Sequence, residues 1–493
     1  MTQHLNSNDL SVVNMQGSDH LYHWLENEQI SLAFTTYQTN RLFLVGRKEN
    51  GRLVVNERLF DKPMGLYASG ENLYMATRYQ IWQFENRLAQ GEQYQGSDRL
   101  YVPSQSHTTG DLNVHDVVVT KAQQILFINT DFSCLATVQA GFSFAPVWKP
   151  PFITKLAAED RCHLNGLAMQ DDQPMYVTAC SAANEAAGWR NHRMDGGVVI
   201  HIPSNEIIAT GLSMPHSPRW YQGKLWLLNS GTGELGYLDD HQFVPVTFCP
   251  GFVRGLAFWK NYALVGLSQL RSKTFTGLAL ETRLSEQNMT AQCGLAVIDL
   301  NTGNVLHALH IGGVVEELFD VVVLPEVRQP RALGFQDDDI DRLISFPDSG
   351  GLMITKPTVK NHGSSQSTQV AGLPRASQSV DSADMAVKYQ KVFHLTPENL
   401  LQYEAMTYPS LQKRWQTQPQ RGELIGVSAS VEGEMVGLVV AECWQKDGQH
   451  QNELISSHVL PSYRHHAIEK KMHQRLQRIL NTNTNTNNNK SKF

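Results

Sequence analysis

The chain has 493 residues, of which 41% are hydrophobic and 18% are charged, and its formal net charge is -6. This length exceeds what one ordinary hydrophobic core supports, so we expect at least two domains. The mildly acidic balance excludes the basic surface that is typical of nucleic-acid binding. No run approaches the roughly 18 apolar residues that a membrane-spanning helix needs, so no membrane partner is expected.

The first 20 residues are polar and are predicted to form a flexible N-terminus. They lack the basic head and apolar centre of a signal peptide. Six cysteines are scattered along the chain without a CxxC pair. Such cysteines are typical of buried free thiols in a reducing compartment, so we expect a cytoplasmic protein.

Residues 21–330 contain a repeat of about 50 residues, a period that indicates a β-propeller or a similar array. Each unit opens with a short turn motif and continues through an apolar strand, a polar turn and a second apolar strand. In a propeller these motifs would line the central channel. The motifs are Met64-Gly65-Leu66, His115-Asp116-Val117, Asn165-Gly166-Leu167, Ser217-Pro218-Arg219, Arg254-Gly255-Leu256 and Phe319-Asp320-Val321.

The pattern within the units is that of strands, because apolar residues alternate between turn residues, as around Trp226. Almost no segment before residue 330 has a helical stripe. Six motifs predict an all-β ring of six blades, with seven as the alternative. The segment LAFTTYQTNRLFLVG precedes the first motif, and FDVVVLPE contains the last. We expect these early and late strands to share one blade, which hides the edges of an open array.

Beyond the repeat the composition changes. Residues 331–388 are acidic at first and then rich in Ser, Gln and small residues, which predicts a linker. Residues 389–480 predict a small α/β domain with a helix that starts after Thr396, two strands joined at Glu432-Gly433, a further strand and a basic helix. Residues 481–493, NTNTNTNNNKSKF, predict a disordered polar tail.

Polar residues recur at or beside the turn motifs, and we expect them to converge on one site at the mouth of the channel. His163 and His216 are the candidate catalytic residues, because an imidazole titrates near neutrality. The loop from Ala182 to Val199 is long for a compact repeat, which favours a functional role. The candidate ligand-binding residues are His115, Asp116, Arg161, Asn165, Ser217, Arg219, Arg254, Glu317 and Asp320.

Three interpretations of this site stay open. A hard cation would take oxygen ligands from Asn165, Asp116, Asp320 and either Glu316 or Glu317. An anionic ligand would instead be held by Arg161, Arg219 and Arg254. In the third interpretation, these groups pair with one another and hold the blades together. The three arginines favour a small polar or anionic ligand over a metal, and no divalent metal is expected.

From about residue 20 to 328 the chain resembles a bacterial propeller-like family of unknown function. The resemblance rests on runs such as EDRCHLNGLAM, GLSMPHSPRW and PGFVRGLAF. It implies the fold and the clustering of polar residues but no particular reaction. The six-blade plan is also similar to lactonase and regucalcin-like propellers. Their first metal ligand is an early Glu, and this chain has no obvious match to it.

The C-terminal segment resembles the front half of a GNAT-superfamily acetyltransferase, through its order of elements and through VLPSYRHHAIEK at residues 459–470. In that superfamily a turn of pattern R/Q-x-x-G-x-G/A presents backbone N–H groups to the pyrophosphate of acetyl-CoA. The resemblance implies acetyl-CoA as the cofactor. The implied binding residues are Val459, Arg464, His465, His466 and Ala467.

Two residues depart from this pattern. Ala467 replaces the first glycine and hinders close approach of the backbone. Glu469 replaces the second glycine or alanine, and its carboxylate would repel a pyrophosphate. The later strands of a complete acetyltransferase are also missing. A degenerate fold used for docking or for dimerisation is therefore the alternative, since an incomplete sheet has an open edge that invites a second copy.

Three hypotheses for the function follow. In the first, the propeller binds a small polar or anionic molecule and is tethered to an acetyltransferase-like module that modifies it or once did so. In the second, the propeller is a non-catalytic interaction scaffold. In the third, the propeller is itself an enzyme of lactonase, hydrolase or lyase type, with His163 or His216 as acid or base and Arg219 or Arg254 as an electrostatic clamp.

Overall fold

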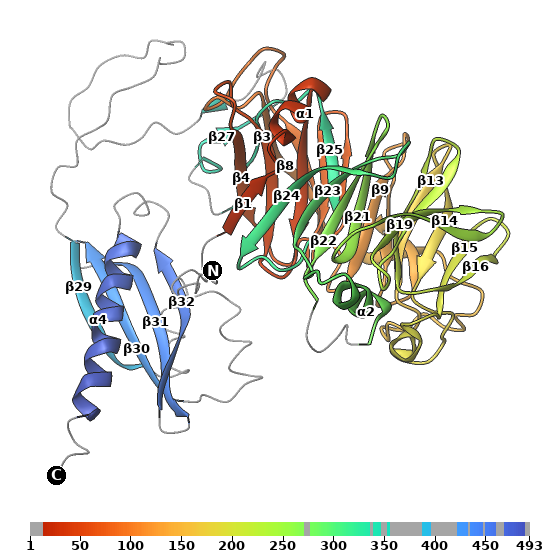
Figure 1. The fold of residues 1–493 in the computed structure, drawn as a ribbon. Coiled ribbons are helices and arrows are strands. Elements are labelled where there is room, and N and C mark those ends of the chain that lie inside the picture. Colours follow the sequence, from red (N-terminus) through yellow and green to blue (C-terminus); the bar gives the residue numbers. More distant parts are fainter. Residues whose placement is uncertain are drawn as a thin grey trace. The chain divides into compact units, whose positions relative to one another are not determined.

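The computed structural model describes residues 13–270, 277–335, 339–346, 353–354, 387–395, 422–431, 434–446, 449–459 and 468–488. The chain divides into two compact units. The first comprises Met1–Phe335 and Asp339–Thr355, and the second comprises Gln336–Asp338 and Lys356–Phe493. The first unit is mostly β structure (Figure 1).

Six sheets with four or five strands each make up the body of the first unit. Each sheet is built from strands that follow one another along the chain, apart from the additions described below. The first sheet contains β2 (Ile30–Thr36), β3 (Arg41–Arg47) and β4 (Leu53–Leu59) with β25 (Val321–Pro325), and the second contains β5 (Leu66–Ser69), β6 (Asn72–Ala76), β7 (Gln80–Asn86) and β8 (Arg99–Thr108). The third contains β9 (Val114–Val119), β10 (Ile125–Asn129), β11 (Cys134–Gln139) and β12 (Phe142–Trp148), and the fourth contains β13 (Leu164–Gln170), β14 (Gln173–Ala179), β15 (Gly197–His201) and β16 (Glu206–Leu212). The fifth contains β17 (Pro215–Tyr221), β18 (Lys224–Asn229), β19 (Glu234–Asp239) and β20 (Gln242–Phe248), and the sixth contains β21 (Phe252–Trp259), β22 (Tyr262–Ser268), β23 (Gly294–Asp299) and β24 (Val305–Gly313).

One strand from each sheet lies toward a common centre. β5 contacts β9, β9 contacts β13, β13 contacts β17, β17 contacts β21, β21 contacts β25, and β25 contacts β5. These six strands therefore follow one another in a closed cycle. β5 and β25 begin within their turn motifs, and the other four strands begin one or two residues before theirs.

An early strand and a late strand of the first unit share one sheet, as the sequence predicted. β25 pairs antiparallel with β2, and Val321 lies opposite Phe34 in the register. Thr35 reinforces the junction, since its backbone N–H donates to the Asp320 carbonyl at 3.0 Å. The edge of β2 is thereby covered by a strand from the other end of the unit.

Apolar side chains fill the spaces between neighbouring sheets. One cluster joins Trp226 and Leu228 of β18 to Val265 of β22 and Ile298 of β23, and all four are buried. The pleat sends alternate side chains to opposite faces of a strand, so a sheet with a neighbour on each side needs apolar residues on both faces. This is why the central strands, such as β10, are buried along their whole length.

The beginning of the chain differs from our expectation. Residues 1–20 were expected to be flexible, but β1 (Val13–Gly17) pairs antiparallel with β24 as a fifth strand. Helix α1 (Leu21–Glu28) follows and buries Leu21, Trp24 and Leu25. Helix α2 (Ala279–Glu286) and a 3₁₀ turn, η1 (Gly188–His192), are further helical elements that were not predicted. Each is only two turns or less, so its apolar face is short in the sequence.

The first unit continues beyond residue 330, where we placed the start of the linker. β26 (Pro330–Ala332) pairs in parallel with β8. Leu333 and Leu343 pack with Leu88, Leu100 and Val102. The short strands β27 (Leu343–Ile344) and β28 (Met353–Ile354) pair with each other. Apolar residues at wide spacing therefore bind this polar stretch to the sheets.

The second unit contains an antiparallel sheet of four strands in the order β29 (Val387–Leu395), β30 (Glu423–Val431), β31 (Glu434–Lys446) and β32 (Gln449–Val459). Helix α4 (Ile468–Asn488) lies across one face of this sheet (Figure 1) and packs Met472 and Leu476 against it. The helix extends through residue 488, into the tail that we expected to be disordered. Adding residues to a helix that has already formed is easier than starting one, even for Asn and Thr. The helix predicted after Thr396 lies outside the described residues.

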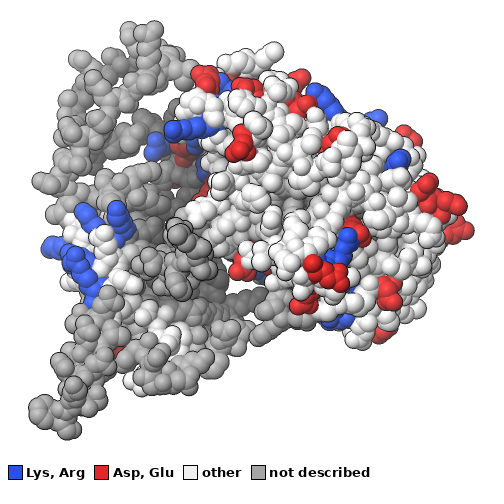
Figure 2. Space-filling model, in the orientation of Figure 1, with Lys and Arg blue, Asp and Glu red and all other residues white. Residues whose placement is uncertain are grey.

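All six cysteines are free thiols, and five of them are buried. This agrees with the scattered spacing in the sequence. Among the described helices, none is both long enough and apolar enough to cross a membrane. On the face of the first unit shown in Figure 2, acidic and basic side chains are scattered without a continuous basic region.

Candidate functional site

The structure aligns the turn motifs more accurately than the sequence did. Asp116 and Asp320 each accept a hydrogen bond from a backbone N–H of the following sheet, from Leu167 at 3.0 Å and from Leu66 at 2.9 Å. Ser217 has the same role, because its Oγ accepts from the Gly255 N–H at 3.0 Å. Ser217 therefore corresponds to these two aspartates. His216, not Ser217, is the first residue of its motif.

With this correction, the second residue of each turn motif is alternately a glycine and a hydrogen-bond acceptor around the cycle. Gly166 illustrates why glycine is needed, since a Cβ there would lie 2.2 Å from Cδ of Pro218. The first positions carry the larger side chains. In chain order the pairs are Met64-Gly65, His115-Asp116, Asn165-Gly166, His216-Ser217, Arg254-Gly255 and Phe319-Asp320.

Arg219 is paired within the protein. Its Nη1 lies 2.7 Å from Oδ2 of Asp116, and its Nη2 lies 3.9 Å from Oδ1 of Asp320. Both carboxylates are almost fully buried. Burial raises the pKa of Asp320, the nearby Arg219 opposes this shift, and Asp116 adds to it. For these three residues, the interpretation in which the polar groups hold the sheets together fits the geometry.

Three histidines lie close together, away from the Arg219 ion pair. They are His115, His163 and His216. The ring centroids of His115 and His163 are 4.8 Å apart, and each is 6.3 Å from that of His216. All three side chains are buried. One ring nitrogen from each lies within 4.8 Å of the other two. The structure thus brings both candidate catalytic histidines together with one candidate ligand-binding residue.

The Nδ1 atom of each histidine has a partner outside this cluster. In His115 it lies 2.9 Å from the Asn113 carbonyl and 2.8 Å from Oγ1 of Thr130. In His216 it lies 2.8 Å from the Met214 carbonyl. A backbone carbonyl only accepts, so each of these two Nδ1 atoms carries the hydrogen.

His163 is held by a carboxylate instead of a carbonyl. Its Nδ1 lies 3.0 Å from both carboxylate oxygens of Asp160. Asp160 Oδ2 also accepts a hydrogen bond from Nε1 of Trp189 at 2.9 Å. The Trp189 ring packs on the His163 ring at 4.2 Å, and Arg190 covers the outer face of the indole at 4.7 Å. The long loop singled out in the sequence therefore contributes directly to the histidine cluster.

The backbone is left-handed beside each histidine. φ is +52° at Asn113, +51° at His163 itself and +48° at Met214, and it is +44° at Asp160. Such values are uncommon for residues other than glycine, and they concentrate at functional sites. Burial, together with the neighbouring groups His163 and Arg254, lowers the pKa of both His115 and His216 well below its usual value. These two imidazoles are neutral at pH 7.

Arg254 is the cation beside the cluster. Its guanidinium lies over the rings of Phe319 at 4.8 Å and Phe252 at 5.5 Å, and these rings contact His115 and His216 respectively. Its Nε has no hydrogen-bond partner. Burial lowers the pKa of Arg254, and the charge of Glu317 opposes this shift.

These groups surround a cavity of about 200 Å³ at the start of the innermost strands. A second and larger cavity, of about 570 Å³, lies along the other ends of the same strands. The polar groups Asp116 and Arg219 in the second cavity satisfy each other, so we regard the smaller one as the candidate site. Its lining includes Tyr37, Lys62, Met64, Asn113, His115, Asp160, His163, Trp189, Arg190, Met214, Arg254 and Phe319.

The other predicted residues of the first unit have internal partners. Arg161 pairs with Glu159 at 2.7 Å and donates to Asn184 at 2.7 Å. Asn165 accepts a hydrogen bond from Thr178 at 2.7 Å. Glu317 accepts a hydrogen bond from the hydroxyl of Tyr37. Four of the side chains proposed as ligands for a hard cation, Asn165, Asp116, Asp320 and Glu317, therefore have partners within the protein.

In the second unit, Val459 is buried at the end of β32. Arg464, His465, His466 and Ala467 lie outside the described residues.

Sequence reasoning missed Asp160 and Thr130 as partners of the histidines, and Phe319 as a wall of the cavity. The repeat contained a signal for Phe319, which stands at the same motif position as His115 and His216. Asp160 had no such signal, because its contact with His163 depends on a local turn of the backbone.

A family model described as a domain of unknown function, DUF4915, matches residues 19–333. No curated protein matches the chain. The solved structures that resemble it include a protein of unknown function from Bacteroides caccae, with 10% identity and a TM-score of 0.38 over 60% of this chain and 98% of that one. A virginiamycin B lyase from Staphylococcus aureus has 9% identity and a TM-score of 0.31 over 61% and 99%. A gluconolactonase from Xanthomonas campestris has 15% identity and a TM-score of 0.32 over 59% and 84%.

Identities this low carry no information about activity. The family match covers the region in which the sequence resembled a propeller-like family of unknown function. With that match over well more than half of its length, the chain belongs to the DUF4915 family.

Proposed function

We propose that the first unit is a six-bladed β-propeller that binds a small anionic molecule in the cavity beside Arg254 and the three histidines. The observation that carries this proposal is the buried guanidinium of Arg254, whose Nε has no partner. A buried guanidinium with an unpaired N–H donor is costly. An anion in the cavity would remove that cost.

The chemical class of the ligand follows from the groups that face it. Arg254 offers a planar set of donors that matches a carboxylate or a phosphate. The aromatic rings of Phe319 and Trp189 supply apolar walls. The cavity of about 200 Å³ fits a small molecule and excludes a polymer. Arg161 and Arg219, the other two arginines considered, are already paired and support the sheets instead.

A second candidate function is catalysis at the same place. His163 and Asp160 have the arrangement of a base and the carboxylate that orients it. This arrangement supports the hypothesis of a hydrolase or lyase that acts on the bound anion. The interaction scaffold remains the alternative in which the cavity has no ligand.

The test is thermal unfolding of the full chain with acetate, inorganic phosphate and a panel of small dicarboxylates, after dialysis against a chelator. A ligand at 100 times its Kd stabilises the folded state by about 2.7 kcal/mol. We expect this stabilisation to disappear in Arg254→Met and to persist in the control Arg41→Met, whose guanidinium pairs with Glu57 at the surface. Ligand stabilisation that survives in Arg254→Met would contradict the proposal. The proposal would also be contradicted if no ligand stabilised either protein and Arg254→Met without ligand were more stable than the wild type. That result would favour the interaction scaffold.

For the second unit we propose an acetyltransferase-like fold that binds acetyl-CoA. The order of β29 to β32 followed by α4 supports it, because the proposed pyrophosphate turn then lies between Val459 and Ile468. Calorimetric titration of the full chain with acetyl-CoA tests the idea. Ala467→Gly restores the glycine of the pattern and should tighten binding. Absence of heat in both proteins would favour the docking or dimerising role.

A further inference from the structure

Hydrogen bonds within the protein do not account for the arrangement of the three histidines. Each ring directs Nδ1 outward, to Thr130 and a carbonyl in His115, to a carbonyl in His216, and to Asp160 in His163. Nε2 is then the nitrogen that remains on each ring. In His216 this atom is fully buried and has no hydrogen-bond partner. A buried polar atom left unpaired costs about 1–3 kcal/mol, so a fold keeps one only for a reason.

We propose that His115, His163 and His216 bind one divalent transition-metal ion of the zinc class through their Nε2 atoms. This inference deepens the proposed function, since the ion would stand at the wall of the cavity that holds the anion. It differs from the metal site considered from the sequence, which relied on oxygen ligands from Asp116, Asp320 and others.

The distances suit such an ion. Nitrogens within 4.8 Å of one another leave a central point about 2.8 Å from each, compared with Zn–N bonds of about 2.0–2.1 Å. Each ring therefore needs to move by less than about 1 Å to reach bonding distance. Three neutral imidazoles are also a known ligand set for catalytic zinc, and they suit copper, nickel and cobalt as well.

The outer partners match those of metal-bound histidines. Such histidines almost always donate Nδ1–H to a carboxylate or a backbone carbonyl, which fixes the tautomer and leaves Nε2 for the ion. Here His115 and His216 donate to carbonyls, and His163 lies against Asp160. If the three rings were only a structural core, their second nitrogens would be expected to find partners. Instead, Nε2 of His216 has no partner, and one nitrogen of each ring lies within 4.8 Å of a nitrogen of the other two.

The charges around the cluster connect the ion to the anion. Asp160 supplies a negative charge on the side of His163. Arg254 is a positive charge on the other side, and a bare dication would be repelled by it. Because His115, His163 and Arg254 line the same cavity, an anion bound there can touch both Arg254 and the ion. Metal and anion are therefore expected to increase each other's affinity, and this effect must be reciprocal.

The experiment uses the full chain, freed of metal by a chelator and titrated with Co²⁺, whose visible absorption reports the geometry of its ligands. We expect one equivalent to bind with the spectrum of a tetrahedral site and to be displaced by Zn²⁺. His216→Gln should abolish the signal. Asp160→Asn should weaken binding 10-fold to 100-fold, the loss typical of a missing outer partner. Asn tolerates the φ of +44° at this position, so this variant should stay folded.

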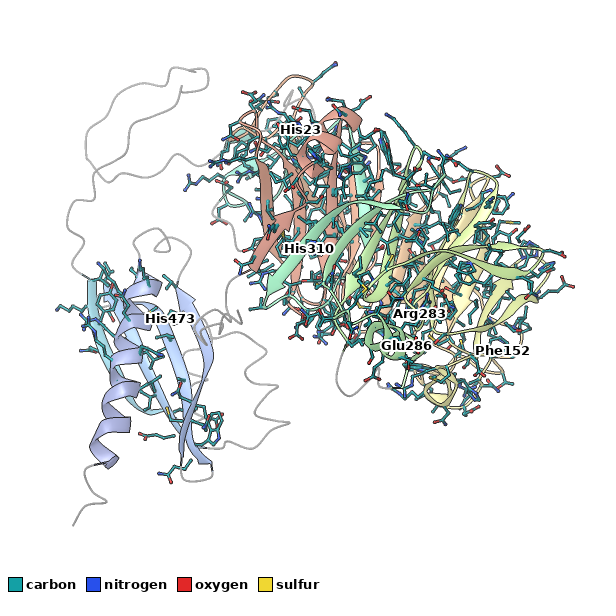
Figure 3. The ribbon with its side chains drawn as sticks, viewed as in Figure 1. His23, Phe152, Arg283, Glu286, His310 and His473 are labelled. Carbon is teal, nitrogen blue, oxygen red and sulfur yellow. The ribbon has the colours of Figure 1, made fainter. Side chains whose placement is uncertain are left out.

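The matched control is His310→Gln. His310 is exposed on β24, where Figure 3 labels it, and it is not part of the cluster. Its removal should leave the Co²⁺ spectrum and affinity unchanged. The proposal is overturned if folded wild-type protein binds no stoichiometric Co²⁺. It is equally overturned if His216→Gln and Asp160→Asn bind Co²⁺ as the wild type does, or if His310→Gln loses as much as they do.

The outcomes for the metal and the anion can be told apart. The metal is rejected and the proposed function kept if an anion stabilises the chelator-treated protein, this effect is lost in Arg254→Met, and no stoichiometric Co²⁺ binds. Tetrahedral Co²⁺ binding that no anion strengthens, with no anion stabilisation in either state, would keep the metal and reject the anion site.

Discussion

Removal of the Arg219 guanidinium tests whether the ion pair at the centre of the first unit is as desolvated as its geometry indicates. Arg219→Met keeps most of the side-chain volume and removes the charge. The carboxylates of Asp116 and Asp320 then stay in place, each with a side chain only 4% exposed and without a cation. We expect the free energy of unfolding to fall by about 3–5 kcal/mol, the usual effect of breaking a buried pair. For a unit of about 350 residues, that corresponds to roughly 4–7 °C in Tm.

The matched control is Arg41→Met. Arg41 forms its ion pair with Glu57, whose side chain is 52% exposed. Pairs of this kind contribute about 0.2–1 kcal/mol. Chemical denaturation of the three proteins at pH 8, followed by tryptophan fluorescence, measures the difference. Equal losses in Arg219→Met and Arg41→Met would refute the reasoning.

The pH dependence supplies an independent check. In the wild type, burial raises the pKa of Asp320 to about 7, above its value in the unfolded chain. The folded state then binds more protons than the unfolded state between about pH 4 and 7, so this group lowers stability as the pH rises through that window. Without Arg219, Asp320 holds its proton more tightly, because that guanidinium opposes the rise in its pKa. The destabilisation by Arg219→Met should therefore be smaller at pH 5 than at pH 8, and a larger loss at pH 5 would contradict the argument.

Two further predictions concern packing. Gly166→Ala places a Cβ against Pro218, so it should lower the free energy of unfolding by about 1–3 kcal/mol in denaturant titrations. In the control Gly312→Ala the added Cβ meets nothing within 4 Å, so the change should be less than about 0.5 kcal/mol. Similar values for the two would count against the close approach of neighbouring sheets. Met472→Asp puts a charge on the buried face of α4. It should abolish the hydrogen-exchange protection of that helix without changing the unfolding of the first unit. The control Gln474→Asp, at an exposed position, should leave α4 protected. Loss of protection in both variants would show that helix propensity, not packing, holds α4.

The sheets could be predicted from the sequence because their signals are local. Alternating apolar residues and recurrent turn motifs depend on a few neighbouring residues, and they identified the inner strands and the pairing of β2 with β25. Helix α1 also had a local signal, since Leu21, Trp24 and Leu25 have helical spacing, but it is too short to stand out. The pairing of β1 with β24 had none, because β1 is a strand of five residues in a polar stretch that has no turn motif.

The candidate site was harder to predict, for a physical reason. The repeat identified which polar residues lie near the centre, but not which of them satisfy one another. Arg219 and Arg254 have the same side chain, yet Arg219 pairs with two aspartates while the Nε of Arg254 has no hydrogen-bond partner. This difference depends on side-chain directions across three sheets. The sequence assignment also placed the fourth motif one residue late, at Ser217, although His216 lies 51 residues after Asn165, as the period requires. That shift hid the equivalence of His216 with His115, and so the convergence of the imidazoles.

The pairing of β2 with β25 has a consequence for synthesis of the chain. Thr35 and Asp320, which meet at this junction, are separated by 285 residues. At 5–20 residues per second, the ribosome takes roughly 15 s to 1 min to make that stretch. For this period β2 to β4 have left the ribosome while the strand that covers β2 does not yet exist. An uncovered apolar edge is an aggregation hazard, so the nascent chain is a natural client for chaperones until Val321–Pro325 emerges.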